Sequence, residues 1–224
     1  MPQPLRVEFH CHTIASKDCL TTPRRLVEAC LRKGIDRVVI SDHNTLRGAL
    51  HAREIDPERV IVGEEIKTTA GELLAAYVQE EIPRDLPPLE AVQRLRQQDA
   101  FISVSHPFDA YRHGSWKLSD LDAIRPYVDA IEIFNARCIK PEFNLLARQY
   151  AQQHGLAGTV GSDAHTTFEL GQAVLLLAPF EDAAGLKAAL PAAQEDVHPS
   201  AAWVHLTSRF AVWYKLLFPS RSTQ

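Results

Sequence analysis

Two histidines near the start of the chain, His10 and His12, stand two residues apart. The stretch 5–12 alternates apolar with polar side chains, which is the period of a β-strand. On such a strand both imidazoles point to the same side, where together they can bind one metal ion. A single His-x-His pair is also common as two polar residues at a strand end. The prediction of a metal site therefore depends on the residues that follow.

Other histidines and carboxylates follow the later strands that the sequence predicts. Short apolar runs at 37–41, 60–62, 101–104, 130–134, 157–160 and 172–177 are each typical of a buried strand. Polar side chains that can bind metal stand at the ends of most of these runs. Together with an aspartate shortly after the first pair, the candidate donors are His10, His12, Asp18, His43, Glu65, His106, Asn135, Asp163 and His165.

Predicted helices separate most of these strands. The first begins at Thr22 and Pro23, a favoured cap and a favoured first helical residue, and ends at Gly34. Further helices are expected at 46–53, from 87, at 141–154 and at 183–190, with a hairpin at 66–77 whose turn is 69–71. This alternation favours an α/β barrel of parallel strands. In such a barrel the strand ends converge on one rim, so we expect the candidate donors to meet there.

The donor set predicts more than one ion. It exceeds what a single tetrahedral ion requires, so we expect two to three divalent ions. Mixed nitrogen and oxygen donors suit Zn, Mn or Fe better than Mg or Ca. Water on such an ion has its pKa lowered toward about 7 and can then attack an ester. Each donor taken singly has an ordinary structural explanation, and only their shared position favours a metal centre.

Composition and charge limit the class of protein. The chain of 224 residues carries a formal net charge of −4 and no long basic run, which argues against a dedicated nucleic-acid surface. Its four cysteines form no Cys-x-x-Cys pair and are expected to be reduced thiols of a cytoplasmic protein. We find no signal peptide and no transmembrane run. Neither a P-loop nor the cysteine–arginine spacing of a cysteine phosphatase occurs.

Five short motifs carry a resemblance to a known family. They are His-Cys-His-Thr at 10–13, Ser-Asp-His-Asn-Thr-Leu at 41–46, Gly-Glu-Glu-Ile-Lys-Thr at 63–68, Ser-His-Pro-Phe-Asp at 105–109 and Gly-Ser-Asp-Ala-His at 161–165. In this order they resemble the successive motifs of the PHP (polymerase and histidinol phosphatase) superfamily. Any one motif alone is weak evidence, whereas five in order are highly specific.

The resemblance implies a fold, a cofactor and an activity. The fold is a distorted seven-fold, TIM-like β/α barrel, and the activity is that of a phosphoesterase with a trinuclear metal centre. By position, one ion would be bound by four residues, of which Glu65 bridges to a second ion that His106 also binds. The full assignment is His10, His12, Glu65 and Asp163 for the first ion, and Asp18, His43 and His165 for the third.

The chain departs from the family pattern at several positions. The family often has histidine where Asn135 stands, and an amide oxygen binds metal more weakly. It also often has Ser-Asp-Gly after the first histidines, where this chain has Ser-Lys-Asp-Cys at 16–19. Asp18 is assigned as the ligand because it lies six residues after His12. Glu72 stands where many relatives carry histidine, so it is a candidate ligand or a support for one.

Catalytic and substrate-binding residues are expected beside these donors. His43 and Asp42 form the expected catalytic pair, in which Asp42 orients His43 or a metal water from behind. Arg137 is expected to contact the non-bridging oxygens of a phosphate, because arginine donates two parallel hydrogen bonds to phosphate. Arg112 and Lys67 are further candidates for substrate binding.

The C-terminal segment has a different pattern. We divide the chain into a catalytic barrel at 1–195 and an amphipathic helical tail at 196–224. In the tail, apolar residues recur at helical spacing: Trp203, Leu206, Phe210, Trp213 and Leu217. We expect this helix to pack on the barrel or to form a homo-oligomer contact. The alternative is a helix that lies on a membrane surface.

These observations favour a metal-dependent phosphoesterase, a phosphatase or phosphodiesterase that acts on a small phosphorylated metabolite or a nucleotide through metal-activated water. An amidohydrolase-type metal hydrolase is one alternative, with Lys67 as the only nearby lysine that could be carboxylated. A non-catalytic, metal-binding regulatory module is another. It is disfavoured because such a protein has no physical reason to keep so many buried charges together.

Overall fold

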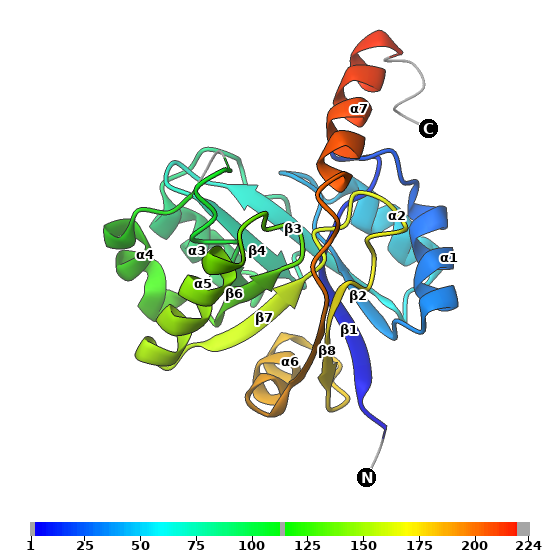
Figure 1. The fold of residues 1–224 in the computed structure, drawn as a ribbon. Coiled ribbons are helices and arrows are strands. Elements are labelled where there is room, and N and C mark those ends of the chain that lie inside the picture. Colours follow the sequence, from blue (N-terminus) through cyan, green and yellow to red (C-terminus); the bar gives the residue numbers. More distant parts are fainter. Residues whose placement is uncertain (1–2, 113–114, 219–224) are drawn as a thin grey trace.

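The computed structural model describes residues 3–112 and 115–218, which form an α/β fold around one sheet (Figure 1). Within them the sheet has nine strands in the order β7-β6-β5-β4-β3-β2-β1-β8-β9. The strands are β1 (Leu5–Cys11), β2 (Arg37–Ile40), β3 (Val60–Lys67), β4 (Glu72–Ala76), β5 (Phe101–Val104), β6 (Ala130–Asn135), β7 (Ala157–Gly161), β8 (Ala173–Leu177) and β9 (Gln194–Val197). The α-helices are α1 (Pro23–Lys33), α2 (Arg47–Ile55), α3 (Pro88–Arg96), α4 (Leu118–Ile124), α5 (Pro141–His154), α6 (Ala183–Ala189) and α7 (Val204–Leu217).

The sheet curls into a nearly closed barrel because β1, besides pairing with β2 and β8, also contacts the chain just after β7, the first strand of the order. Near its carboxyl end, Cys11 forms a parallel bridge with Ala164, just after β7. The amide of His12 donates to the carbonyl of Ala164 over 2.9 Å. Near its amino end, β1 instead pairs with β8, with Leu5 opposite Leu177. The barrel is therefore joined at the rim that carries the histidines and opened by β8 and β9 at the other end.

The predicted seven-fold repeat of parallel strands is correct only in part. The α/β barrel-like architecture is confirmed, but β4, β8 and β9 each run antiparallel to a neighbour. No helix separates β7 from β8 in the described chain, so β8 starts at the rim where β7 ends and must run in the opposite direction. No helix separates β3 from β4 either, and these two antiparallel strands form the predicted hairpin, with Lys67 opposite Glu72.

The helix boundaries follow the predicted caps closely. Thr22 accepts a hydrogen bond from the amide of Arg25 at the start of α1, and Gly34 ends that helix with a φ of 64°. Gly155 ends α5 in the same left-handed conformation. The strand predicted at 60–62 is longer than expected. It continues as β3 to Lys67, so Glu65 lies within a strand and not in the loop after it.

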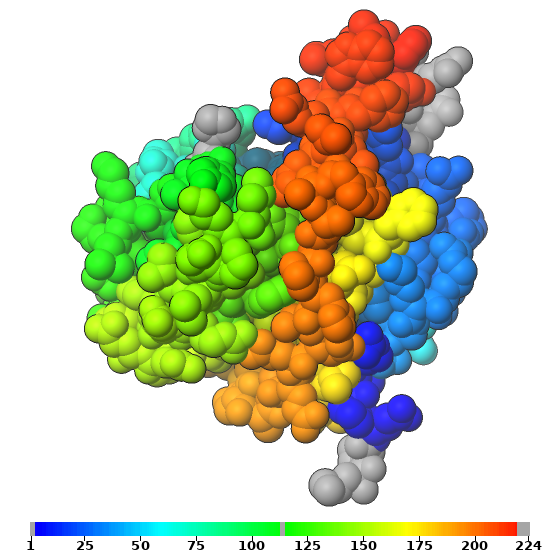
Figure 2. All heavy atoms as spheres, in the orientation of Figure 1, coloured from blue at the N-terminus to red at the C-terminus, as the bar shows by residue number. Residues whose placement is uncertain are grey.

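The last helix, α7, stands on the rim and projects beyond the body of the molecule (Figure 2). Several large apolar side chains on it are exposed, among them Leu206, Phe210 and Trp213. In the described chain no helix is both long and apolar enough to cross a membrane. The sheet extends to Val197 through β9, two residues past the predicted domain boundary, and the division into barrel and tail stays a prediction.

Candidate metal centre

Three groups of side chains on the barrel rim could each hold a metal ion. In each group the possible ligand atoms lie within 4.8 Å of one another. They come from the carboxyl ends of parallel strands, the loops after them and the β3–β4 hairpin, where the barrel brings these segments together. The groups are His12 with His43 and His165, His10 with His12 and Asp163, and Glu65 with Glu72 and His106.

Glu65 lies between these groups and contacts residues of each. Its Oε1 is 3.3 Å from His10 Nε2 and 3.1 Å from His106 Nε2. Its Oε2 is 2.9 Å from His43 Nδ1. Burial alone would raise the pKa of Glu65, but the imidazoles of His10 and His43 lower that pKa well below its ordinary value. Glu65 is thus an anionic carboxylate whose two oxygens face different donor groups, as a bridging ligand requires.

The donor set fits divalent ions because several of its inward-facing atoms have no hydrogen-bond partner in the described chain. Buried polar atoms in proteins are normally hydrogen-bonded, and leaving one unpaired is unfavourable. Here several converging atoms are buried without a hydrogen-bond partner in the described chain: His10 Nε2, His12 Nε2, Glu65 Oε2 and Asp163 Oδ1. The pKa of His12 is lowered to about 3, by burial first and then by the neighbouring His165 and His43. A neutral imidazole is the form that binds metal.

Asp18, a predicted ligand, lies beside His43 and His165. Its Oδ2 lies 3.5 Å from His43 Nε2 and 3.3 Å from His165 Nε2. Burial would raise the pKa of Asp18, and its contacts with both imidazoles lower that pKa well below the ordinary range. The carboxylate is therefore ionised, and its other oxygen, Oδ1, is buried without a hydrogen bond in the described chain.

Glu72, a candidate ligand from the sequence, lies in one donor group with Glu65 and His106. The Oε2 atom of Glu72 lies 3.5 Å from His106 Nε2. The Asn135 side chain is engaged otherwise, because its Oδ1 accepts hydrogen bonds from the Arg137 amide and from Arg112. Asn135 therefore lies beside the donors, and the prediction that it ligates the second ion is not supported by its hydrogen bonds.

Comparison with known proteins places this chain in a family. The family described as PHP-associated matches residues 141–194. An uncharacterized protein from Methanocaldococcus jannaschii is 38% identical over 175 residues, which span 76% of this chain and 70% of that protein. A two-domain protein from Bacteroides vulgatus that contains a predicted PHP-like metal-dependent phosphoesterase superposes with a TM-score of 0.70, at 21% identity, over 88% of this chain and 67% of that one. The chain belongs to the PHP superfamily.

Another solved structure shares the fold over nearly the whole chain. PsfC from Pseudomonas syringae superposes with a TM-score of 0.69 at 16% identity, over 95% of this chain and 99% of that chain. At this level of identity the likeness is one of fold. The five motifs quoted above all lie at the donor rim of this PHP barrel, which explains their order along the chain.

Glu132 is a residue of the PHP centre that the sequence analysis did not assign to the site. It is buried on β6. Its Oε1 lies 2.9 Å from His10 Nδ1, and its Oε2 accepts from the His106 amide over 2.8 Å and from Asn135 Nδ2 over 3.1 Å. Because Nδ1 of His10 faces this carboxylate, Nε2 is left to face the metal position. A glutamate inside an otherwise apolar predicted strand was the signal that could have identified it.

The hydrogen bonds of Asp42 lead through Ser16 to the His12 imidazole, and the catalytic role of Asp42 and His43 stays a prediction. Its carboxylate accepts from the Thr13 amide over 2.7 Å and from the Ser16 hydroxyl over 2.6 Å. That hydroxyl lies 3.3 Å from His12 Nδ1. Since Ser16 already donates to Asp42, it can only accept from His12, which leaves Nε2 of His12 as the metal-facing atom. His43 reaches this network only through its backbone amide, which donates to the Ser16 hydroxyl.

The three predicted phosphate-binding cations have different surroundings. Arg112 reaches the donor set, where it pairs with Asp163 and donates to Asn135 Oδ1 over 3.3 Å. Burial would raise the pKa of Asp163, whereas Arg112 and His10 hold it well below its ordinary value. Lys67 is half-exposed and pairs with Asp85 at 3.5 Å, away from the donors. Of the three, Arg112 is the one whose guanidinium contacts a metal-donor carboxylate and stays a candidate for substrate binding.

Arg137 makes several contacts within the chain, and its predicted contact with phosphate stays untested. It is buried, and its Nε lies 3.1 Å from Glu169 Oε1. Its Nη2 donates to the Val204 carbonyl over 3.0 Å and to Ser208 Oγ over 2.8 Å, both on α7. Its Nη1 lies 2.5 Å from His165 Nδ1. Arg137 therefore connects α7 to a donor of the centre.

The backbone is strained or tightly packed at several donors. His106 and Asp163 have positive φ values of 23° and 51°, a conformation that side chains other than glycine rarely adopt. Such strain is concentrated at functional sites in proteins. At the end of β7, a Cβ on Gly161 would collide with His10 and Glu132. Glycine is thus required in the Gly-Ser-Asp-Ala-His motif because the β7 backbone passes directly against the donor side chains.

Proposed function

We propose that this PHP protein is a metal-dependent phosphoesterase that hydrolyses a phosphate ester of a small metabolite or a nucleotide. The observation that carries the proposal is the set of three adjoining donor groups connected by Glu65, with the Arg112 guanidinium beside them. Two to three ions of Zn, Mn or Fe fit the nitrogen and oxygen donors. When bound, such ions neutralise phosphoryl charge and activate water.

The roles of the chain's own residues follow from their contacts. Glu132 and Asp42 hold the imidazoles of His10 and His12 so that Nε2 faces inward. Arg112 would turn from Asp163 toward the non-bridging oxygens of the substrate, to which a guanidinium can donate two hydrogen bonds. No side-chain nucleophile is needed, and Cys11 lies in the core on the opposite face of β1 from His10 and His12.

A structural relative supports this choice of chemistry. The Bacteroides vulgatus protein with the same fold contains a predicted PHP-like metal-dependent phosphoesterase. The small-molecule substrate and the cytoplasmic location are parts of the proposal. They rest on the absence of a long basic run in the sequence and on four cysteines that are all free thiols.

The amidohydrolase alternative predicts a carboxylated lysine among the ligands. Lys67 was the only candidate, and its ammonium pairs with Asp85 outside the donor groups. The pairing of this lysine with Asp85 disfavours an amidohydrolase centre of the carboxylated-lysine type.

The test is turnover on matched chromogenic substrates. We expect the metal-loaded protein to hydrolyse p-nitrophenyl phosphate or bis-p-nitrophenyl phosphate, to lose this activity on chelation and to leave p-nitroanilide amides intact. Arg112→Lys keeps the charge but loses the fork of donors, so we expect kcat/KM to fall by about tenfold or more. Arg84→Lys, which alters an exposed arginine paired with Asp85, is the control. Amide hydrolysis without phosphoester hydrolysis would reject the proposal.

A further inference from the structure

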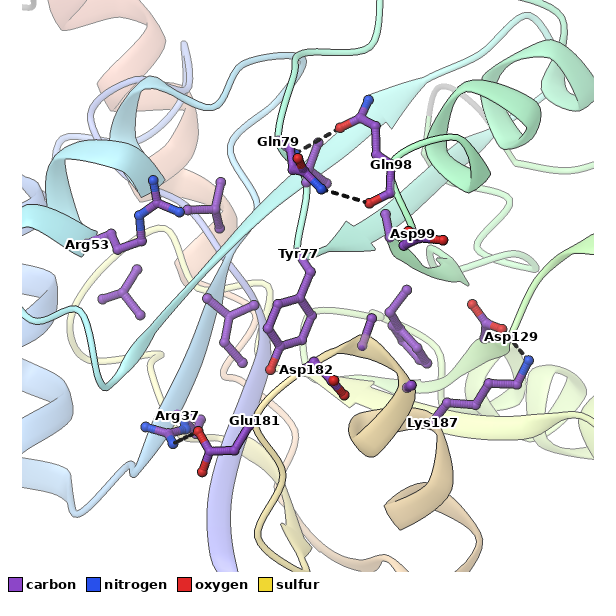
Figure 3. Close-up of a pocket in the computed structure, with 18 of the residues that line it drawn as sticks. Arg37, Arg53, Tyr77, Gln79, Gln98, Asp99, Asp129, Glu181, Asp182 and Lys187 are labelled. Carbon is purple, nitrogen blue, oxygen red and sulfur yellow. Dashed lines mark hydrogen bonds and ion pairs between the residues drawn. The ribbon is translucent and has the colours of Figure 1, made fainter.

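A second cavity lies at the opposite end of the barrel from the metal donors. Its volume is about 1320 Å³, and it is lined by the first residues of three strands, Arg37, Val60 and Phe101. The end of β4 and the start of α6 complete its walls (Figure 3). Parallel strands that carry the metal donors at their carboxyl ends begin here, so the two sites are separated by the length of the barrel.

Tyr77 stands in the middle of this cavity with a strained backbone (Figure 3). Its φ is 63°, a left-handed conformation that is rare for an aromatic residue. In the part of the chain that the structure describes, its hydroxyl makes no hydrogen bond. Burial raises the pKa of Tyr77 to about 12, so the hydroxyl is protonated. Strain of this kind is kept where the surrounding structure has a use for the side chain, as at ligand clamps.

The basic side chains around Tyr77 fall into two sets. Arg96 and Lys187 are both engaged by one buried carboxylate, that of Asp129, at 2.8 and 2.7 Å. By contrast, Arg53 at the end of α2 makes no ion pair or side-chain hydrogen bond with any described residue. Arg37 has only a 3.6 Å contact with Glu181, whose side chain is 87% exposed.

Figure 3 shows Arg37 and Arg53 on one side of the Tyr77 ring and Asp99 on the other. An anionic group would be held by the two guanidinium groups, which bind phosphate with paired hydrogen bonds. A planar ring would stack on the tyrosine face. Asp99 also has a positive φ, of 55°, and its carboxylate could accept from an amino group.

We propose that this cavity is a second ligand site for a nucleoside monophosphate, with its phosphate on Arg37 and Arg53 and its base on Tyr77. The mixed charge of the walls suits such a ligand, which carries its anion at one end and amino and ring nitrogens at the other. This site is independent of the phosphoesterase proposal, because it shares no residue with the metal donors.

The test is binding of the non-hydrolysable phosphonate analogue of adenosine monophosphate to the full chain, by calorimetry and by hydrogen exchange. We expect slower amide exchange at the segments around the cavity, near 60–62, 77–79 and 97–101. Arg53→Gln should weaken binding by about tenfold, as expected for the loss of one charge-assisted contact. Arg32→Gln changes the same charge in the last turn of α1, outside the cavity, and should bind as the wild type does.

Two substitutions at Tyr77 test the stacking part of the proposal. Tyr77→Phe keeps the ring and should bind nearly as the wild type does, whereas Tyr77→Leu keeps the apolar volume, loses the ring and should bind about tenfold more weakly. Circular dichroism establishes that each variant is folded. The proposal is overturned by any of three results: no binding at millimolar analogue, protection confined to the metal rim, or equal affinity of Arg53→Gln and Arg32→Gln.

Discussion

Single carboxylates organise the donor side chains at the rim. Glu132 contacts His10, the His106 backbone and Asn135 at once, and Asp42 holds His12 through Ser16. Neither role can be read from the sequence. Both residues can be recognised in the sequence as acidic groups near a predicted strand end. The direction of their side chains depends on hydrogen-bond partners that are 26 residues distant in the chain.

Glu132→Gln is predicted to weaken metal binding. The amide keeps the shape of the side chain but loses the negative charge that orients His10. Loss of such a support typically lowers metal affinity by about 10- to 100-fold. Glu28→Gln, on the exposed face of α1, is the matched control. Competition with a chromophoric chelator measures the affinity, and equal affinity in the two variants would contradict the role given to Glu132.

Glu64→Gln is predicted to change the pH dependence of stability. Glu64 is fully buried, and burial raises its pKa from 4.5 to about 8 despite one hydrogen bond from the Ile82 amide. The folded state therefore binds a proton that the unfolded state has lost above pH 4.5, and stability falls as the pH rises toward 8. Glutamine cannot ionise, so the variant should lose less stability over this range.

The free energy of unfolding in urea, measured with chelator present at pH 6 and at pH 9, tests this prediction. Glu58→Gln changes an exposed glutamate and should keep the wild-type slope with pH. If Glu64→Gln also keeps that slope, the pKa of Glu64 is not raised in the folded state and the prediction is wrong.

At the scale of elements, the sequence predicted what local rules determine. The caps at Thr22, Gly34 and Gly155 and the hairpin turn near Gly71 depend on adjacent residues, and each is found where expected. Glu72 was a candidate ligand from the sequence, but its place beside His106 could not be predicted. It depends on the register of β4 against β5, which places the start of β4 next to the end of β5 and brings Glu72 to His106.

Arg137 forms a buried ion pair with Glu169 and donates hydrogen bonds to α7, and its loss should be destabilising. Arg137→Gln leaves Glu169 buried without its cation, which typically lowers the free energy of unfolding by about 3–5 kcal/mol. Arg148→Gln breaks an exposed pair with Glu195 and should have an effect of less than about 1 kcal/mol. Urea unfolding compares the two, and equal small effects would show that Arg137 does not stabilise the docked helix.

For the whole molecule, the donor rim was predictable and the closure of the barrel was not. Strands that end in metal-binding residues must be neighbours if those residues are to act together, so the motifs predicted the rim. The antiparallel β8 follows from a short connection after β7, and its place beside β1 depends on the sheet as a whole. The cavity at the other end, around Tyr77, has no sequence motif, because its lining comes from strand starts and helix ends.

The central claim is that the rim holds a centre of several ions bridged by Glu65. The most direct measurement is elemental analysis of gently purified and metal-reconstituted protein, for the wild type and for Glu65→Gln. We predict two to three divalent ions per wild-type chain and a loss of more than one ion in the variant, because Glu65 contacts all three donor groups. One ion or none after reconstitution, or an unchanged content in Glu65→Gln, would contradict the account.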